Sequence, residues 1–356
     1  MNPPPLSRLP APLGRLIDRR QPVSFTFEGV AYQGVQGDSI ASALLANGRW
    51  LLSRSFKYHR PRGPLTLAGQ DANTMVQLPD EANALADLAP VTPGLVVTGQ
   101  NYSGSLDHDR DAILSRFSRF MPVGFYYRAF YKPKGVWKYW ESFIRAKAGL
   151  GKLNLAFKPT VHDKEYLFAD VAVIGSGPAG LTAALAAAAA GAKVLLVEQE
   201  SLLGGSLNWA RFDLEGRKGE ETARALVEAV TRHPGIRVLT NAVCNAWFAD
   251  NYLPIISGKR LYKARAKQCI VASGAFDQPV IFRNNDLPGV LLASAAQRLM
   301  KLYAVRPGQR AVVLTGHDDG YLAALDLLDA QVEVAALIDL RPRAQASTPL
   351  AEALQL

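Results

Sequence analysis

A glycine-rich segment between residues 171 and 198 is the part of the sequence best suited to binding a ligand. The apolar run VAVI leads into GSGPAG, which contains Gly175, Gly177 and Gly180. In a dinucleotide-binding turn the first glycine allows a tight bend. The second lets the backbone approach a pyrophosphate, and the third lets the helix pack close to the strand. The Ala-rich run that follows favours a helix whose N-terminus attracts anionic groups.

An acid follows this turn at the distance that a nucleotide ribose requires. Glu198 closes the apolar run VLLVE, and a carboxylate there accepts hydrogen bonds from ribose hydroxyls. The same charge disfavours a 2′-phosphate, so the pattern indicates NAD rather than NADP, but it does not choose between NAD and FAD. The alternative is a glycine turn in an ordinary α/β domain. The strand, helix and acid around the glycines favour the nucleotide site.

The amino-acid composition is typical of a globular protein with a large hydrophobic core. The chain has 356 residues, of which 49% are hydrophobic, so two or three domains are expected. No secretory signal and no apolar run of membrane-spanning length is recognisable, and we expect a cytoplasmic protein. The two cysteines, Cys244 and Cys269, form no CxxC motif, which argues against a redox pair or iron–sulfur ligands within this chain. No residue set predicts a metal site.

The front of the chain carries the whole excess of positive charge. Residues 1–160 contain 20 Lys and Arg against 11 Asp and Glu, whereas the remainder contains 20 of each. The excess therefore lies outside the nucleotide-binding segment. It suits contacts with an anionic group or an acidic partner.

Residues 1–104 predict an α+β domain of the β-grasp, ferredoxin-like kind. Two strands, VSFTFEG and VAYQGV, precede a helix with Asp38 as its expected N-cap, and strands at 74–78 and 94–99 can complete the sheet. The basic loop SRSFKYHRPRGP (53–64) occupies the place of a ferredoxin's cysteine loop but contains no cysteine. The domain is therefore expected to lack a cluster, and its loop either is solvated or grips an anionic group or another subunit.

Residues 105–165 form a connecting region rich in aromatic and basic side chains. Eleven aromatics lie between Phe117 and Phe143, with five Lys or Arg among them and Arg116 directly before them. Single-stranded nucleic acid, a membrane surface, the protein's own core and a partner protein are all conceivable targets. Aromatic anchors with arginine at the margin favour a partner protein, and we expect neither nucleic acid nor membrane as the target.

Residues 166–300 predict the Rossmann-type NAD-binding domain, and residues 301–356 the start of a second, inserted βαβ unit. The pair Gly204–Gly205 is expected to let its loop pass close to the cofactor. The run IVASGAFDQP should return the chain to the cofactor. In the second unit, Asp318 and Asp319 would repel a pyrophosphate, so we expect no nucleotide there. Further strands are needed to complete this fold, so the sequence reads as the front part of something larger.

Four segments together carry a resemblance to a known family. GDSIASALLANG, SRSFKYHRPRGP, MPVGFYYRAFYKPKGVW and VAVIGSGPAGLTAALAAAAAGAKVLLVEQESLLGGSL resemble the alpha subunit of heterotetrameric sarcosine oxidase. The resemblance implies a cluster-free ferredoxin-like domain followed by an NAD-binding fold with two dinucleotide-binding domains, as in flavoproteins. It implies beta, gamma and delta partners, with FMN at the alpha–beta interface and FAD in the beta subunit. Tetrahydrofolate would bind through a carboxy-terminal domain that these 356 residues do not include.

The resemblance also implies a set of cofactor contacts. These are Gly175, Gly177, Ala179, Gly180, Glu198, Gln199, Glu200, Gly205, Ser206, Val243, Ser273 and Gly274. Glu200 departs from the arginine frequent in the family, which changes the charge beside the adenosine. No catalytic residue is implied for this chain.

Three functions remain in view. The first is the NAD-binding part of a sarcosine oxidase-like complex, which demethylates sarcosine to glycine in a partner subunit. The second is one component of an opine or D-hydroxyproline dehydrogenase-type complex, against which the lack of clustered cysteines counts. The third is a truncated, non-catalytic binding module.

Overall fold

The computed structural model describes residues 8–120, 124, 132–147, 150–158, 161–214 and 216–342. The chain divides into two compact units. Unit 1 combines Met1–Phe157 with Gln278–Leu356, and unit 2 is Lys158–Asp277. Residues 278–300, expected in the Rossmann-type domain, thus belong to unit 1.

Unit 1 contains a small sheet around a buried helix. Strands β1 (Asp18–Phe27) and β2 (Val30–Gln36) form an antiparallel hairpin, and β7 (Val96–Val97) pairs with β1 in parallel. Helix α1 (Ile40–Ala46) is buried along its whole length. The alternating apolar side chains of β1 and the apolar sequence of α1 explain this core, because each side chain on the inner face is removed from water.

Two details of this front sheet differ from the sequence prediction. Ser39, rather than Asp38, is the N-cap of α1, and its hydroxyl accepts a hydrogen bond from the backbone N–H of Ser42. Asp38 is buried beneath the cap, where it accepts hydrogen bonds from the backbone of Val35 and the side chain of Arg8. Strand β5 (Met75–Val76) pairs with β6 (Ala84–Leu85), while the expected pairing of residues 74–78 with residues 94–99 is present as a single antiparallel bridge between Gln77 and Thr98.

The remainder of unit 1 consists of short elements around this sheet. Strands β3 (Ser53–Arg54) and β4 (Pro61–Arg62) pair across the basic loop. The helical segments that the structure describes in this unit include η1 (Ala72–Thr74), η2 (Arg110–Phe120), α3 (Trp137–Lys147) and α6 (Ala293–Tyr303).

The second βαβ unit packs with α6 and the N-terminal segment. Strands β16 (Arg310–Thr315) and β17 (Glu333–Asp339) are parallel, and α7 (Asp319–Asp329) connects them. Leu9 and Met300 share a hydrophobic core with side chains of α7. The backbone N–H of Leu9 also donates to the carbonyl of Ala304 at 2.7 Å. These contacts explain why residues after 278 join unit 1.

Unit 2 is a six-stranded sheet with the order β12-β9-β8-β15-β14-β13. The strands are β8 (Asp163–Ile174), β9 (Val194–Val197), β12 (Ile236–Leu239), β13 (Ala242–Cys244), β14 (Tyr252–Ser257) and β15 (Arg260–Val271). The first four in the order are parallel, and β14 and β13 continue the sheet in antiparallel fashion. The sheet therefore joins a Rossmann-type half to an antiparallel extension.

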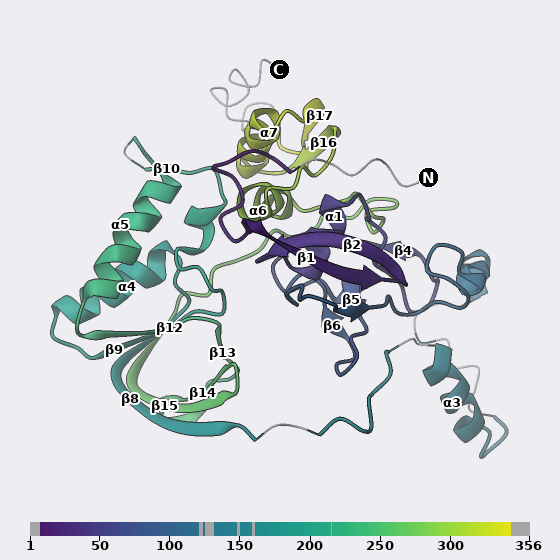
Figure 1. Ribbon diagram of the computed structural model, residues 1–356, viewed down its shortest axis with the longest axis horizontal. Helices are drawn as coiled ribbons and strands as arrows, with labels where there is room; N and C mark the ends of the chain where they lie inside the picture. The colour runs from purple at the N-terminus through teal and green to yellow at the C-terminus, as the bar shows by residue number, and fades with distance from the viewer. Residues whose placement is uncertain are drawn as a thin grey trace. The chain divides into compact units, whose positions relative to one another are not determined.

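Helices α4 (Pro178–Ala189) and α5 (Gly219–Arg232) lie on the same side of the parallel strands (Figure 1). Leu181, Ala184 and Ala188 of α4 are buried against Val173 and Leu196 of the sheet. Their spacing places them on one face of the helix, and their small size permits close packing. Between the helices the chain forms η3 (Gly205–Asn208) and the hairpin β10 (Asp213–Leu214) and β11 (Arg217–Lys218), and η4 (Ala249–Asn251) precedes β14.

Candidate functional site

The glycine turn lies between the end of β8 and the start of α4, at the carboxyl edge of the parallel strands. Gly175 has a φ of +99°, and a Cβ there would lie 2.3 Å from the carbonyl oxygen of Ala272. A Cβ on Gly180 would lie 1.9 Å from the carbonyl oxygen of Gly175. Both glycines are therefore required by the turn itself, because a side chain at either position would collide with backbone.

Gly177 has a different environment. A Cβ at this position would meet no heavy atom within 4 Å, and the residue has an ordinary φ of −66°. Gly177 is the N-cap of α4 and provides no side-chain hydrogen bond to the helix. The first N–H groups of a helix have no partner within the helix, so this open end suits an anionic group.

Glu198 reaches the turn from the end of β9. Its Oε2 accepts hydrogen bonds from the backbone N–H of Ser176 at 2.8 Å and from the hydroxyl of Ser176 at 2.6 Å. Its Oε1 accepts from the backbone N–H of Glu200 at 2.9 Å. Glu198 is 8% exposed. These three donors fix a carboxylate beside the glycines, where it is suited to accept hydrogen bonds from ribose hydroxyls.

Ser176 is a residue of this site that the sequence prediction missed. Its position between two glycines of the motif was the available signal, because a short polar side chain there lies within reach of the acid on the next strand. The backbone carbonyl of Ser176 also accepts a hydrogen bond from Gly204 at 3.0 Å.

The Gly204–Gly205 pair brings a further loop against the turn. Both glycines have positive φ values, and a Cβ on Gly205 would lie 2.8 Å from Cα of Gly177. Any larger residue at 205 would collide with the turn. Ser206 follows directly, within η3.

The other predicted contact residues lie at the same edge of the sheet or next to it. Backbone hydrogen bonds join Ala242 to Glu198 at 2.9 Å and Ala272 to Ile174 at 2.8 Å. Val243 follows Ala242 in the chain, and Ser273 and Gly274 follow the strand that flanks the turn. Ala179, Gln199 and Glu200 adjoin the turn in sequence. The carboxyl edge of a parallel sheet is where α/β proteins of this kind bind ligands.

The two cysteines are free thiols and partly buried, Cys244 on β13 and Cys269 on β15. Burial raises the pKa of the Cys244 thiol and of the Cys269 thiol. Both thiols are therefore poor nucleophiles at neutral pH, because the thiolate is the reactive form.

The turn of the second βαβ unit is held by internal ion pairs. Arg341 contacts Asp318 and Asp339, each at 2.8 Å. Its hydrogen bonds hold the pKa of the Asp339 carboxyl well below its usual value. Residues 343–356, the end of this predicted segment, lie outside the described residues.

The basic loop 53–64 makes contacts within unit 1. Arg60 and Arg62 both bind Asp286, at 2.7 Å and 2.5 Å. The guanidinium of Arg54 donates to backbone carbonyls, including that of Leu106 at 2.7 Å. All three arginines of this loop therefore bind groups of the same chain.

The aromatic connecting region exposes much of its apolar surface. Phe120 is 77% exposed and Tyr139 is 78% exposed, and Ile113, Phe117 and Phe143 each exceed half. Residues 125–131, part of this predicted segment, lie outside the described residues. Exposed apolar groups in this number are typical of a surface that another protein covers.

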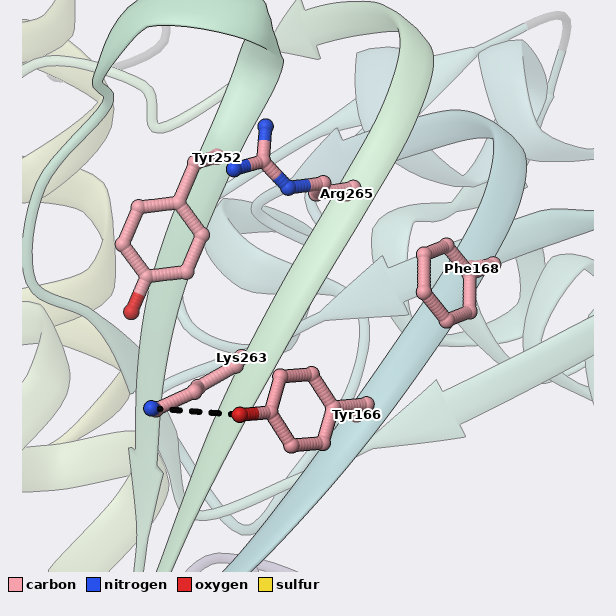
Figure 2. A pocket seen from close by; sticks show the side chains of 5 residues that line it. All are labelled: Tyr166, Phe168, Tyr252, Lys263 and Arg265. Carbon is pink, nitrogen blue, oxygen red and sulfur yellow. Dashed lines mark hydrogen bonds between the residues drawn. The ribbon is translucent and has the colours of Figure 1, made fainter.

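A groove of about 310 Å³ lies on the unit 2 sheet, over strands β8, β15 and β14. Its lining residues are Tyr166, Phe168, Tyr252, Lys263 and Arg265, which form cross-strand pairs on β8, β14 and β15 (Figure 2). Phe168 is the lining residue of β8 that is nearest in sequence to Gly175, and the seven residues between these positions span roughly 23 Å of strand. The groove is therefore distinct from the candidate nucleotide site.

Two family descriptions match the chain. Residues 169–349 match the pyridine nucleotide-disulphide oxidoreductase family, and residues 20–102 match a 2Fe-2S iron-sulfur cluster binding domain. Residues 20–102 contain no cysteine. Because protein ligands of such clusters are mainly cysteine thiolates, the residues present do not fit a cluster.

Curated proteins that resemble the chain include subunits of amine-oxidising enzymes. The chain is 38% identical over 351 residues to the sarcosine oxidase alpha subunit of Rhizobium meliloti (strain 1021), covering 92% of this chain and 35% of that protein. It is 28% identical over 186 residues to an opine oxidase subunit of Agrobacterium tumefaciens (strain Ach5), covering 48% of this chain and 37% of that protein. The chain thus spans about a third of the length of the curated relatives it matches.

Among solved structures, the L-proline dehydrogenase from P. horikoshii has a similar fold. The TM-score is 0.65 at 22% identity, over 93% of this chain and 56% of that one. The similarity supports a front domain followed by a dinucleotide-binding fold. Separately, the described residues contain no helix long and apolar enough to cross a membrane.

Proposed function

Because the chain belongs to the pyridine nucleotide-disulphide oxidoreductase family, we propose that it is the NAD-binding portion of the alpha subunit of an amine-oxidising complex. NAD would bind at the carboxyl edge of the unit 2 sheet, with its pyrophosphate at Gly177 and the N-terminus of α4. The Gly204–Gly205 loop and the return segment at 273–274 would border it.

The observation that carries this proposal is the fixed carboxylate of Glu198 beside the glycine turn. Ser176 and Glu200 hold both of its oxygens with three donors. A preorganised carboxylate at this position can accept hydrogen bonds from the hydroxyls of an adenosine ribose. A 2′-phosphate would face the charges of both Glu198 and Glu200, so NAD is favoured over NADP.

The role proposed for the chain is to hold the cofactor and dock partners. The first turn of α4 would neutralise the pyrophosphate, and Glu198 would orient the ribose. NAD supplies hydride chemistry where it reacts, but here we propose a tightly held ligand. We assign the chain itself no catalytic base or nucleophile.

The proposed reaction of the whole complex is oxidative demethylation of sarcosine to glycine. The alpha subunit of sarcosine oxidase is the relative with 38% identity over nearly the whole chain, which supports this substrate. The amine would be oxidised in a beta subunit that carries FAD, with FMN at the alpha–beta interface and gamma and delta subunits completing a cytoplasmic heterotetramer. The exposed aromatic region of η2 and α3 supports a docking role.

Opine oxidation is the second candidate, favoured by the similarity of about half the chain to an opine oxidase subunit. The reconstituted complex distinguishes the two functions. Turnover of sarcosine without turnover of opines supports the first proposal, and the opposite result supports the second.

Nucleotide binding by the purified chain tests the site. Titration calorimetry should show that Glu198→Ala weakens NAD binding at least about tenfold, because hydrogen bonds to a charged group are worth about 1.5–3 kcal/mol. Gly177→Val should weaken it similarly by blocking the approach of the pyrophosphate. The variant should still fold, because the position is open and its φ is ordinary.

A matched control is Glu221→Ala, which removes an exposed acid from the first turn of α5. It should leave NAD affinity unchanged. Wild-type affinity in both Gly177→Val and Glu198→Ala would rule out the assigned site.

A further inference from the structure

The groove on the unit 2 sheet belongs to a larger apolar face, called here the outer face. Along β8 and β14 successive side chains point to opposite faces of the sheet. One face contributes Leu167, Leu253 and Ile255 to a buried core. The outer face carries Tyr166, which is 66% exposed, and Phe168, which is 75% exposed. A sheet face that stays in water normally alternates to polar residues, so apolar side chains on both faces indicate that the outer one is covered.

Apolar side chains extend the outer face beyond the groove. Ile256 on β14 is 47% exposed, and it pairs with Leu261 of β15 across the strands. Phe248, just before η4, is 56% exposed, and its ring stacks on that of Tyr252 with the centroids 5.8 Å apart. The face therefore combines aliphatic and aromatic groups, as the apolar centre of a protein–protein interface does.

The outer face also has an excess of positive charge. No carboxylate lies within ion-pair distance of Lys263 among the residues that the structure describes. Arg265 lies 3.6 Å from Asp250, which is 87% exposed, so water screens this pair. Further along β15, Lys267 binds Asp170 at 2.7 Å. Three cations against two carboxylates leave the face positively charged, which suits an occupant that carries carboxylates.

The two tyrosine rings of the groove already have cations over them. Nζ of Lys263 lies 5.3 Å from the centroid of the Tyr166 ring, and the guanidinium of Arg265 lies 5.4 Å from that of Tyr252 (Figure 2). The rings attract these cations and so keep both charges at the groove. Proteins that bind single-stranded nucleic acid stack bases on free ring faces. The groove is therefore better suited to carboxylates than to bases.

We propose that the outer face binds an acidic segment of a partner protein, in which carboxylates flank an apolar anchor. The carboxylates would pair with Lys263 and Arg265, and the anchor would pack on Phe168 and Ile256. A second copy of this face is a poorer occupant, because it would bring like charges together. The outer face is separate from the exposed aromatic region of η2 and α3, which belongs to unit 1. The proposal does not depend on NAD binding.

Peptide binding by the full chain tests the proposal. The chain is immobilised without nucleotide, and surface plasmon resonance measures binding of the synthetic peptide Glu-Glu-Phe-Leu-Glu-Glu at up to about 1 mM. We expect a dissociation constant below about 1 mM. The affinity should fall at least about threefold when NaCl rises from about 50 to about 300 mM, because salt screens exposed charges. The same peptide with Gln in place of each Glu should bind at least about tenfold more weakly.

Three variants locate the peptide. Lys263→Glu reverses the charge at the groove and should weaken binding at least about tenfold. Phe168→Ala removes an exposed anchor and should weaken binding at least about fivefold. Its melting temperature should stay that of the wild type, because the side chain is 75% exposed. Arg224→Glu reverses an exposed charge on α5 and changes the net charge as Lys263→Glu does, but it should bind as the wild type does.

Four results would overturn the proposal. The first is no binding of the acidic peptide by the wild type at about 1 mM, and the second is unchanged binding by folded Lys263→Glu or Phe168→Ala. Tighter binding of a single-stranded oligonucleotide than of the peptide would indicate a nucleic-acid surface. Self-association in sedimentation equilibrium that Phe168→Ala abolishes would indicate a contact between two copies. NAD binding is measured separately, so none of these results bears on the nucleotide site.

Discussion

Gly180→Ala should destabilise unit 2, whereas Gly177→Ala should not. The two glycines belong to one motif and lie three residues apart. A Cβ on Gly180 would lie 1.9 Å from the carbonyl oxygen of Gly175 and 2.9 Å from its carbonyl carbon. A Cβ on Gly177 would meet nothing within 4 Å. Comparing them separates a glycine that the fold needs from one that a ligand needs.

The expected loss for Gly180→Ala follows from two opposing effects. Overpacking costs about 1–3 kcal/mol, and we take the upper end because the obstructing atoms are backbone. Alanine regains up to about 1 kcal/mol through its higher helix propensity. The free energy of unfolding should therefore fall by about 2 kcal/mol, which corresponds to a melting temperature lower by at least about 4 °C. Gly177→Ala should change it by less than about 0.5 kcal/mol.

Calorimetric melting of both variants measures the difference. Hydrogen exchange of peptides from β8 and α4 then shows whether the loss is located at the turn. A Gly180→Ala protein that melts with the wild type would refute the geometry described for the turn. An equal loss in Gly177→Ala would refute the distinction between the two glycines.

Three further changes have defined outcomes. Asp286→Asn should cost about 1–2 kcal/mol at pH 7. The hydrogen bond from Arg60 lowers the pKa of the folded carboxyl from its usual 3.8, so this stabilisation is present above pH 3.8 and is lost as the pH falls below it. Urea unfolding at pH 7 and pH 3 should show the larger difference at pH 7, and an equal difference would contradict the ion pair. Ser176→Ala should weaken NAD binding by about 1 kcal/mol in calorimetry, because Glu198 loses one of its donors; an unchanged affinity would show that the hydroxyl does not matter. Cys244 should react slowly with a thiol reagent at pH 7.5 and rapidly after unfolding, since burial raises its pKa; fast reaction of the native protein would contradict the burial.

Local sequence predicted the nucleotide-binding element well. Its strand, turn, helix and second strand lie within 28 consecutive residues, from Val171 to Glu198, and their order follows from periodicity and glycine spacing. The structure has these elements as β8, α4 and β9. The assignment of the contact residues to NAD stays a prediction.

The front domain was predicted less completely. The hairpin and helix of the first 46 residues were expected, but the pairing of β5 with β6 and the cap at Ser39 were not. Strands of two residues carry too little alternation to predict their partners. Ser and Asp are comparable N-caps, so sequence could not choose between neighbours.

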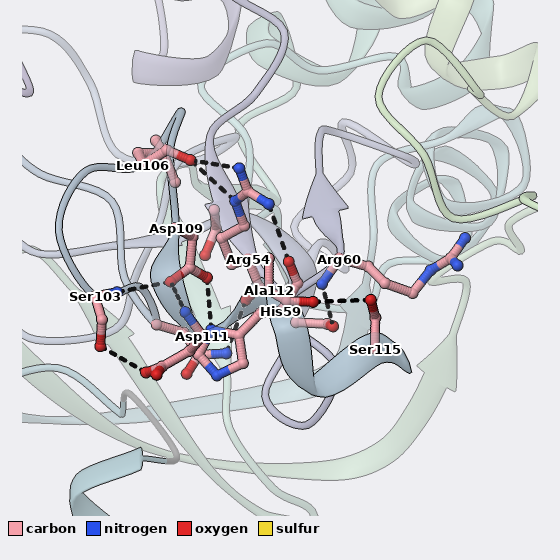
Figure 3. A network of polar contacts seen from close by, with 12 residues as sticks. Arg54, His59, Arg60, Ser103, Leu106, Asp109, Asp111, Ala112 and Ser115 are labelled. Atoms are coloured by element: carbon pink, nitrogen blue, oxygen red, sulfur yellow. Dashed lines mark hydrogen bonds and ion pairs between the residues drawn. The ribbon is translucent and has the colours of Figure 1, made fainter. Parts of the chain in front are cut away.

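What sequence alone determined is the order of elements and the chemical type of the nucleotide turn, because both are encoded by neighbouring residues. Tertiary structure decided which distant residues meet. Ser176 bonds Glu198, which lies 22 positions away in the sequence. His59 contacts Asp109 at a sequence separation of 50 (Figure 3), and Arg60 binds Asp286 at a separation of 226. Such contacts depend on the register and packing of whole strands and helices, and the local periodicity of apolar residues does not determine these.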